Sequence, residues 1–323
     1  AAEVGLREVR YNNEPSNTKR GIDSSNPFFF FDPSKCIVCS RCIRACDDLQ
    51  VTHALSIDGR GFDSRIIAGA DQAFKESDCV SCGACVNECP VGALEEKQLR
   101  AAGSPDKVVR TTCGFCGVGC QFDAGIKGNQ LVTMKPAADS PVNNGHSCVK
   151  GRFASVYVNH KERLTTPLIR ESIDGEFREA SWEEAYAFIV ERWKRIADES
   201  GPDAIGTITS SRSTNELNYL GSKLMRAVVG TNNVDNCARV CHSATVKGMM
   251  KVFGAGAGTN SLGDIDITDL LLASGCNPLH SHPVTGSRIK RARKRGMKLI
   301  VADPIETDFA KMADIHLQLR PGT

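Results

Sequence analysis

The spacing of hydrophobic positions changes near residue 180 of the chain. Beyond that point, apolar residues recur with the period of an amphipathic helix, and short apolar runs separate the helical stretches. The first helix is expected to start at Ser181-Trp182-Glu183-Glu184, where the serine hydroxyl can accept a hydrogen bond from the first turn. It is expected to end near Glu199, with four residues facing inward: Ala185, Phe188, Ile189 and Trp193.

The same alternation continues to the end of the chain. Further helices are expected over residues 216–229, 242–253 and 284–295. Apolar strands are expected between them, over residues 204–209, 268–274 and 297–302. Because strands that alternate with helices form parallel sheets covered by helices, the pattern predicts an α/β parallel-sheet domain over residues 166–323.

In the first half of the chain the spacing of cysteines, and not that of hydrophobic residues, is the informative pattern. Among the 15 cysteines, a C-x2-C-x2-C-x3-C run occurs twice. This run resembles that of bacterial two-cluster ferredoxins, in which the fourth cysteine of each run ligates the other cluster. It assigns one 4Fe-4S cluster to Cys36, Cys39, Cys42 and Cys89, and a second to Cys79, Cys82, Cys85 and Cys46. An α+β two-cluster ferredoxin-like domain is therefore predicted over residues 33–100, after a polar linker over 1–32.

A pair of zinc sites is the alternative, because zinc also binds cysteines spaced two residues apart. Four cysteines in one run, the repeat of that run and Pro90 after its last cysteine favour iron–sulfur clusters. The first run departs from the pattern at Asp47, which stands where proline is expected. The long separation of the runs indicates an insertion, with Gly59-Arg60-Gly61 as its turn.

A third group of cysteines has a different spacing and comprises Cys113, Cys116, Cys120 and Cys148. The glycines 114, 117 and 119 lie between the first three, and they permit a close approach of the backbone. With the segment from Gly145 to Arg152, this group resembles the amino-terminal cluster domain of enzymes that carry a molybdenum or tungsten bis(molybdopterin guanine dinucleotide) cofactor. The resemblance implies a small 4Fe-4S domain over residues 108–165, with Lys150 between the cluster and the pterin.

Two expected strands end in residues suited to a nucleotide. One strand runs into Gly275-Cys276-Asn277-Pro278 and the other into Asp303-Pro304. A glycine lets the backbone approach a phosphate, and a carboxylate can accept hydrogen bonds from guanine or ribose. Together with Ser281-His282-Pro283, these segments resemble the guanine-dinucleotide segment of formate dehydrogenases. The resemblance implies cofactor contacts from Gly275, Asn277, Pro278, His282 and Asp303, as well as from Lys150.

The segment from Asn236 to Ser243 carries the expected reaction centre. Cys237 and Cys241 lie one helical turn apart, and His242 follows the second cysteine. A thiolate is a soft ligand for a transition metal, and an adjacent imidazole can transfer a proton. The formate dehydrogenase family carries cysteine or selenocysteine followed by histidine at this centre. That implies Cys241 as the ligand of molybdenum or tungsten, with Cys241, His242 and Lys150 as catalytic residues. Cys237 is expected to be structural, and Cys276 is expected to be a buried small residue and not a ligand.

From Asp32 to Thr323 the chain resembles the catalytic subunit of cytoplasmic NAD-linked formate dehydrogenases. The resemblance covers the amino-terminal part of that subunit. It implies reversible oxidation of formate to carbon dioxide, with electrons leaving through three 4Fe-4S clusters. It also implies a partner, which is a flavin- and NAD-binding subunit or another iron–sulfur electron-transfer subunit. The chain departs from the family at Ile305, where a basic residue is frequent, and the pterin-binding domain is expected to be incomplete at its C-terminus.

Charge and composition narrow the range of partners. The 40 basic and 38 acidic residues give a net charge of +2, which argues against binding to nucleic acid. No apolar run is long enough for membrane insertion. Ligand thiolates require reduced cysteines, which favours a cytoplasmic location. The basic run from Lys290 to Arg295 is expected to be a solvated helix face.

Two other functions are alternatives. One is an iron–sulfur electron-relay subunit without pterin catalysis, resembling the large iron–sulfur subunit of NADH dehydrogenase. The other is a pterin enzyme for a different substrate, such as nitrate. The pair Cys241-His242 together with Lys150 favours catalysis over relay, and the context from Arg239 to Ser243 favours formate over nitrate.

Overall fold

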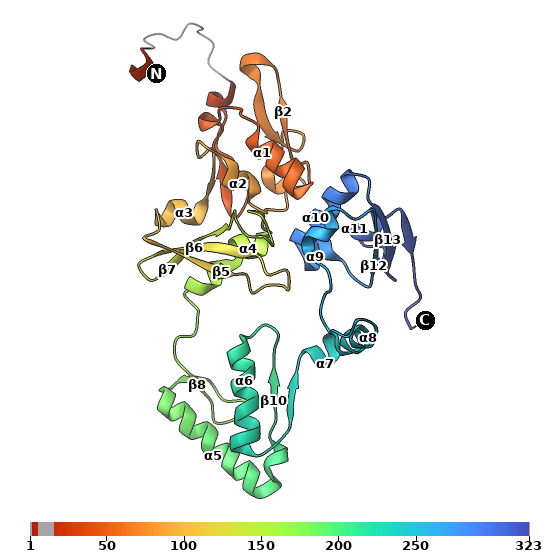
Figure 1. The fold of residues 1–323 in the computed structure, drawn as a ribbon. Helices are drawn as coiled ribbons and strands as arrows, with labels where there is room; N and C mark the ends of the chain where they lie inside the picture. The colour runs from red at the N-terminus through yellow and green to blue at the C-terminus, as the bar shows by residue number, and fades with distance from the viewer. Residues whose placement is uncertain (1, 6–15, 323) are drawn as a thin grey trace. The chain divides into compact units, whose positions relative to one another are not determined.

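The chain divides into two compact units in the computed structural model, which describes residues 2–5 and 16–322 (Figure 1). One unit combines residues 1–159 with 261–323, and the other is residues 160–260. The expected domain over 166–323 is thus shared between the two units. Of the expected linker, residues 6–15 lie outside the described part of the chain.

The two cysteine runs fold as similar halves around one core. Each run forms a loop and a short helix: α1 (Arg41–Arg44), continued by the π-helix η4 (Ala45–Gln50), and α2 (Ala84–Glu88). Two antiparallel pairs complete this region, namely β1 (Phe29–Phe31) with β4 (Leu94–Glu96) and β2 (Leu55–Asp58) with β3 (Arg65–Ala68). The β2–β3 hairpin occupies the place of the predicted insertion. Helix α3 (Lys97–Ala102) follows β4.

Strand β1 corrects the expected extent of the linker. Phe29 and Phe31 are buried in a core with Leu55 and Phe74. The ring of Phe28 stacks on that of Phe153, with 4.9 Å between the centroids. This aromatic run belongs to the core because exposing its rings to water would cost about 25 cal/mol for every Å² of apolar surface.

An antiparallel sheet that the sequence pattern did not predict follows the two-run region. Its strands are β5 (Lys107–Thr112), β6 (Gln121–Lys127) and β7 (Gln130–Pro136), paired in that order. The loop between β5 and β6 carries three cysteines of the third group. Helix α4 (Val149–Phe153) packs against β7 and begins directly after Cys148, the fourth cysteine.

Residues 261–322 complete the first unit with a parallel sheet. Its order is β12 (Leu270–Ser274), β13 (Lys298–Ala302) and β14 (Ile315–Leu317). Three helices connect these strands, namely α9 (Pro278–Ser281), α10 (Pro283–Lys294) and α11 (Asp308–Lys311). Leu299, Val301 and Phe309 are fully buried between the sheet and its helices.

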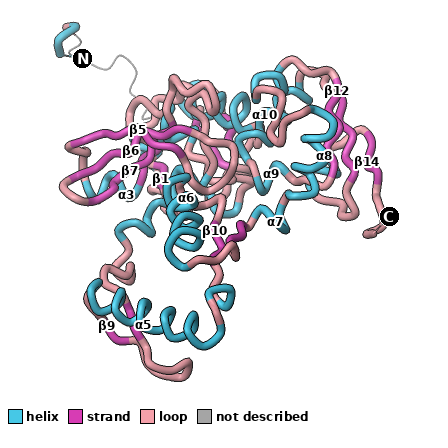
Figure 2. Tube along the Cα trace, turned by 60° about the horizontal axis from the view of Figure 1, so that its bottom comes forward, coloured by secondary structure: helices cyan, strands magenta, loops and turns pink. Residues whose placement is uncertain are grey.

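The second unit contains most of the remaining predicted elements (Figures 1 and 2). Ser181 caps α5 (Trp182–Ser200), and its Oγ accepts from the Glu184 N–H at 3.1 Å. Strands β10 (Thr207–Thr209) and β11 (Val234–Asn236) pair in parallel, and β8 (Leu168–Ile169) pairs antiparallel with β9 (Arg178–Glu179). The other helices are α6 (Asn215–Lys223), continued by the π-helix η9 (Leu224–Val229), α7 (Ala238–Cys241) and α8 (Ser243–Phe253).

The inward face of α5 is narrower than predicted. Ile189 is 43% exposed, so its predicted inward position is wrong. Ile169 and Ala180 pack against Ala185 and Phe188, whereas Ile189 lines an open cavity together with Ile205 and Leu224. In residues 2–5 and 16–322, no helix has the combined length and hydropathy that a membrane span requires.

Candidate functional site

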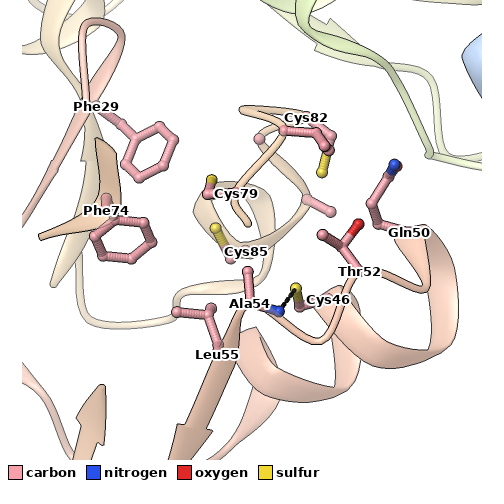
Figure 3. A pocket seen from close by; sticks show the side chains of 13 residues that line it. Phe29, Cys46, Gln50, Thr52, Ala54, Leu55, Phe74, Cys79, Cys82 and Cys85 are labelled. Atoms are coloured by element: carbon pink, nitrogen blue, oxygen red, sulfur yellow. Dashed lines mark hydrogen bonds between the residues drawn. The ribbon is translucent and has the colours of Figure 1, made fainter. Parts of the chain in front are cut away.

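The first two predicted cysteine quartets each line a cavity of their own. One cavity is lined by Cys46, Cys79, Cys82 and Cys85 (Figure 3). The other is lined by Cys36, Cys39, Cys42 and Cys89. In both cavities the fourth cysteine comes from the opposite run, which is the arrangement that the spacing predicts.

The loops of the two runs repeat one backbone conformation. Val38 and Ser81 have φ values of 52° and 53°, and two positions further on Ser40 and Gly83 have 61° and 75°. Positive φ is costly for a β-branched residue and persists only where the surroundings impose it. The conformation turns amides toward sulfur, since the N–H of Val38 and that of Ser81 each donate at 3.4 Å to the cysteine two residues earlier.

Two further amides donate to cysteine sulfurs in these cavities. The Ala54 N–H donates to Cys46 Sγ at 3.3 Å (Figure 3), and the Leu94 N–H donates to Cys89 Sγ at 3.4 Å. Such donors favour the thiolate form. Burial acts in the opposite direction and raises the pKa of Cys82 to about 12. Buried thiols of this kind become thiolates beside a cation, so the cavities fit iron-containing groups.

The quartets differ from a site for one ion. In the described part of the chain, no group of three or more His, Cys, Asp or Glu side chains could hold a single metal ion. A cluster makes a different demand, because its cysteines bind separate iron atoms and their sulfurs stand further apart than the ligands of one ion. A shared cavity lined by four sulfurs meets that demand.

The third quartet lines another cavity, together with Lys150, and comprises Cys113, Cys116, Cys120 and Cys148. Burial raises the pKa of Cys120 to about 12. Space beside this quartet is tight, since a Cβ on Gly151 would lie 3.3 Å from Cys113 Sγ and 2.6 Å from Phe122 Cζ. The Lys150 Nζ donates to the His280 carbonyl at 3.4 Å. Lys150 therefore extends from the third cavity to helix α9.

A larger cavity, of about 910 Å³, lies at the carboxyl end of β12. It is lined by Gly275, Asn277, Pro278 and His282, which are four of the predicted cofactor residues. Gly117 from the loop of the third quartet also lines it. Asn277 Oδ1 is buried and has no hydrogen-bond partner among the described residues. Since buried acceptors are nearly always satisfied, this oxygen fits a site for a polar ligand such as a nucleotide.

Two predicted residues near this cavity behave differently. Of the described residues, Asp303 is not among those that line the cavity. Its Oδ1 accepts from the Ile305 N–H at 2.8 Å, which closes the turn after β13, so its cofactor contact stays a prediction. Cys276 lines the cavity and is exposed. Its predicted burial is wrong because the loop after β12 opens onto the cavity.

Cys241 and His242 lie in the unit of residues 160–260, where α7 meets α8. Both side chains are exposed. The His242 N–H donates to Ala238 O at 3.1 Å, and its carbonyl accepts from the Val246 N–H at 2.8 Å, so His242 ends one helix and begins the next. Cys237 Sγ accepts from the Ser211 N–H at 3.3 Å and thereby joins the ends of β10 and β11. The roles of Cys241 and His242 stay predictions.

The sequence pattern missed several buried polar residues. Arg152 forms an ion pair with Glu96, with 2.9 Å between Nη2 and Oε2, and both side chains are almost completely buried. Burial, followed by the charges of two nearby arginines, lowers the pKa of His146 to about 4. Arg152 stands in the motif that contains Lys150, but its partner comes from a distant strand and could not be identified from the sequence.

Three known domain families match the chain in succession. A 4Fe-4S dicluster domain matches residues 35–93, a molybdopterin oxidoreductase Fe4S4 domain matches 106–160, and a molybdopterin oxidoreductase domain matches 163–323. Among solved structures, acetylene hydratase from Pelobacter acetylenicus is similar with a TM-score of 0.53 and 26% identity, over 65% of this chain and 29% of that one.

Curated relatives match almost the whole chain. "Probable oxidoreductase YjgC" of Bacillus subtilis strain 168 is 40% identical over 93% of this chain and 34% of its own length. "Putative formate dehydrogenase SH0748" of Staphylococcus haemolyticus is 36% identical over 99% of this chain and 36% of its own length. The chain thus spans about a third of the length of these relatives. The order of the matched domains and these relatives show that the chain belongs to the molybdopterin oxidoreductase family and resembles formate dehydrogenase.

Proposed function

We propose that this chain is part of an enzyme that oxidises formate reversibly to carbon dioxide at a molybdenum or tungsten bis(molybdopterin guanine dinucleotide) centre. The observation that carries the proposal is the position of Lys150. Lys150 lines the cavity of the third cysteine quartet, and its Nζ donates to the carbonyl of His280 on α9, the helix that lines the cavity of about 910 Å³. The cationic side chain of Lys150 therefore extends from the proposed cluster site to the proposed cofactor site.

The residues of the chain have distinct proposed tasks. Gly275, Asn277, Pro278 and His282 would hold the guanine dinucleotide, with Asp303 near them, and Cys241 would be the protein ligand of the metal. His242 would orient formate and hold a proton beside the reacting carbon. When bound, the metal–pterin centre supplies two-electron redox chemistry, which the protein positions and tunes.

The three quartets would hold 4Fe-4S clusters, the first two in a ferredoxin-like region. Such clusters supply one-electron steps that lead electrons away from the reacting centre. Ser147, the chain neighbour of Cys148 in the third quartet, donates through Oγ at 3.0 Å to the carbonyl of Cys82, so the chain segments that carry these two cysteines are in direct contact. We propose that the electrons pass to a flavin- and NAD-binding subunit, or to another iron–sulfur subunit, in the cytoplasm.

The name of the Staphylococcus haemolyticus relative supports formate as the substrate. The name of the structural neighbour denotes a different reaction, acetylene hydration, so a substrate assay is the decisive test. We expect the native protein, purified without oxygen, to reduce a viologen dye when formate is added. A Cys241→Ala variant should lose this activity by about 100-fold or more, since even the outer partners of a metal site contribute 10–100-fold.

Cys237→Ser is the matched control, because a serine oxygen can accept the same hydrogen bond from Ser211. It should retain near-native activity. Unreduced dye despite full iron and pterin content would contradict formate as the substrate. Absence of pterin from the native protein would instead favour the electron-relay alternative.

A further inference from the structure

Arg152 is the largest side chain that the structure buries completely. It is 1% exposed, and Glu96, its partner at 2.9 Å, is 3% exposed. The guanidinium also donates to Thr133 Oγ1 at 3.2 Å and to the Met134 carbonyl at 2.5 Å. Thr133 in turn donates to Glu96 Oε2 at 2.9 Å. The pair is therefore held in one orientation.

Arg152 lies between a loop that lines the cavity of Cys46, Cys79, Cys82 and Cys85 and the helix that follows Cys148 of the third quartet. Arg152 is on α4, four residues after Cys148, and its N–H donates to the Cys148 carbonyl at 3.0 Å. The Cγ of Arg152 lies 3.1 Å from the position of a Cβ on Gly83, within the loop that joins Cys82 to Cys85. The neighbouring contact from Ser147 to Cys82 ties the same two segments together.

Arg152 and Glu96 differ in their relation to the cavity of Cys46, Cys79, Cys82 and Cys85. Burial lowers the pKa of Arg152, whereas the charge of Glu96 and, less strongly, that of Cys85 raise it. Burial raises the pKa of Glu96, and Arg152, followed by the hydrogen bond from Thr133, acts against this increase. Arg152 is thus the member of the pair that lies beside this cavity, since its Cγ contacts the position of a Cβ on Gly83, which lines the cavity of Cys46, Cys79, Cys82 and Cys85.

Protein stability alone does not explain why this ion pair is buried. Removing two charges from water costs several kcal/mol for each ion, and apolar residues of similar volume often stabilise a fold equally well. A fixed cation beside an iron–sulfur cluster has another consequence. Reduction makes the cluster more negative, and a cation in a medium of low dielectric stabilises that added charge.

We propose that the buried Arg152–Glu96 ion pair tunes the reduction potential of the cluster held by Cys46, Cys79, Cys82 and Cys85. Arg152 raises this potential, and Glu96 limits the increase while fixing the guanidinium. The inference rests on the proposed iron–sulfur occupancy of this cavity and is independent of the substrate.

The test is potentiometry followed by electron paramagnetic resonance on the native protein and on two variants with opposite expected effects. Arg152→Met removes the cation and should lower the midpoint potential. Glu96→Gln keeps the shape but leaves the cation uncompensated, so it should raise the potential. We expect each change to alter the ratio of reduced to oxidised cluster at a fixed potential by about tenfold, or 59 mV for a one-electron couple.

Two controls make the result specific. A Cys79→Ser variant identifies which resonance belongs to this cluster. Arg110→Met removes an arginine that is paired with Asp123 on the exposed side of the same unit, and it should leave all midpoints unchanged. If Arg152→Met does not fold, the sign of the Glu96→Gln shift decides the question.

The outcomes separate the inference from the proposed function. Missing iron in the native protein would overturn the cluster assignment itself. Full iron with unshifted potentials, or with shifts of the same sign in both variants, would overturn the inference and leave the pair a structural one. Opposite shifts with intact iron would support it.

Discussion

At the scale of single residues, close packing around the third quartet can be tested at Gly151. A methyl group there would overlap Phe122 Cζ at 2.6 Å and press on Cys113 Sγ. Because Phe122 is fully buried and cannot move aside, Gly151→Ala should cost about 1–3 kcal/mol and displace Cys113. We expect a loss of iron from the site proposed for the third quartet, measured by iron analysis, and a lower unfolding temperature.

Gly114→Ala is the matched control for this prediction. Gly114 is the chain neighbour of Cys113, but apart from atoms of its two chain neighbours a Cβ on it would have no heavy atom of the described structure within 4 Å. This variant should keep its full iron content. Equal iron in both variants would show that the space beside Cys113 is not limiting.

At the scale of elements, the basic helix α10 binds the end of η4 through two of its side chains. The prediction that its basic face is solvated is therefore wrong for these two residues. Arg291 Nη1 donates to Leu49 O at 2.7 Å, and Lys290 Nζ donates to Val51 O at 3.4 Å. These carbonyls end a helix and have no partners within it, and a helix C-terminus attracts cations. The first turn of η4 contains Cys46, so α10 supports a predicted cluster ligand.

Replacing Arg291 tests this contact. Arg291→Met should lower the free energy of unfolding by about 1.5–3 kcal/mol, the usual value of a hydrogen bond from a charged group. Lys294→Met on the same helix removes only an exposed ion pair, 4.0 Å from Asp48, and should change stability by less than about 1 kcal/mol. Reversible chemical denaturation under anaerobic conditions measures both. A similar loss of unfolding free energy in both variants would show that the hydrogen bond of the half-buried Arg291 does not stabilise the fold more than an exposed ion pair does.

At the scale of the whole molecule, the twelve cysteines of the quartets all lie in the unit of residues 1–159 and 261–323. Their region has short helices and strands, so ligand bonds to iron should contribute much of its stability. We expect anaerobic removal of iron to accelerate amide hydrogen exchange in α1, α2 and α4. Exchange in α5 and α8 of the other unit should stay as it was. Loss of protection in all five helices together would show that the units unfold cooperatively.

The sequence determined the cysteine quartets, because ligand spacing within a run is a local property and the exchange of the fourth cysteine follows from the repeat. It also determined α5, α10 and β12 to within a few residues, since hydrophobic period and capping residues act over one or two helical turns. Strand β5 lacked such a signal, because it is exposed along its whole length and carries no alternation of buried and exposed positions.

Only the tertiary structure decided which polar groups are paired and which apolar ones are covered. Arg291 donates to Leu49 across 242 residues of chain, and Arg152 on helix α4 pairs with Glu96 on strand β4. Burial of these charges depends on partners brought together by folding, so the identity of the side chain alone predicts a solvated surface. Phe29 likewise belongs to a core only because folding pairs β1 with the distant strand β4 and sets its ring against that of Phe74, with 5.3 Å between the centroids.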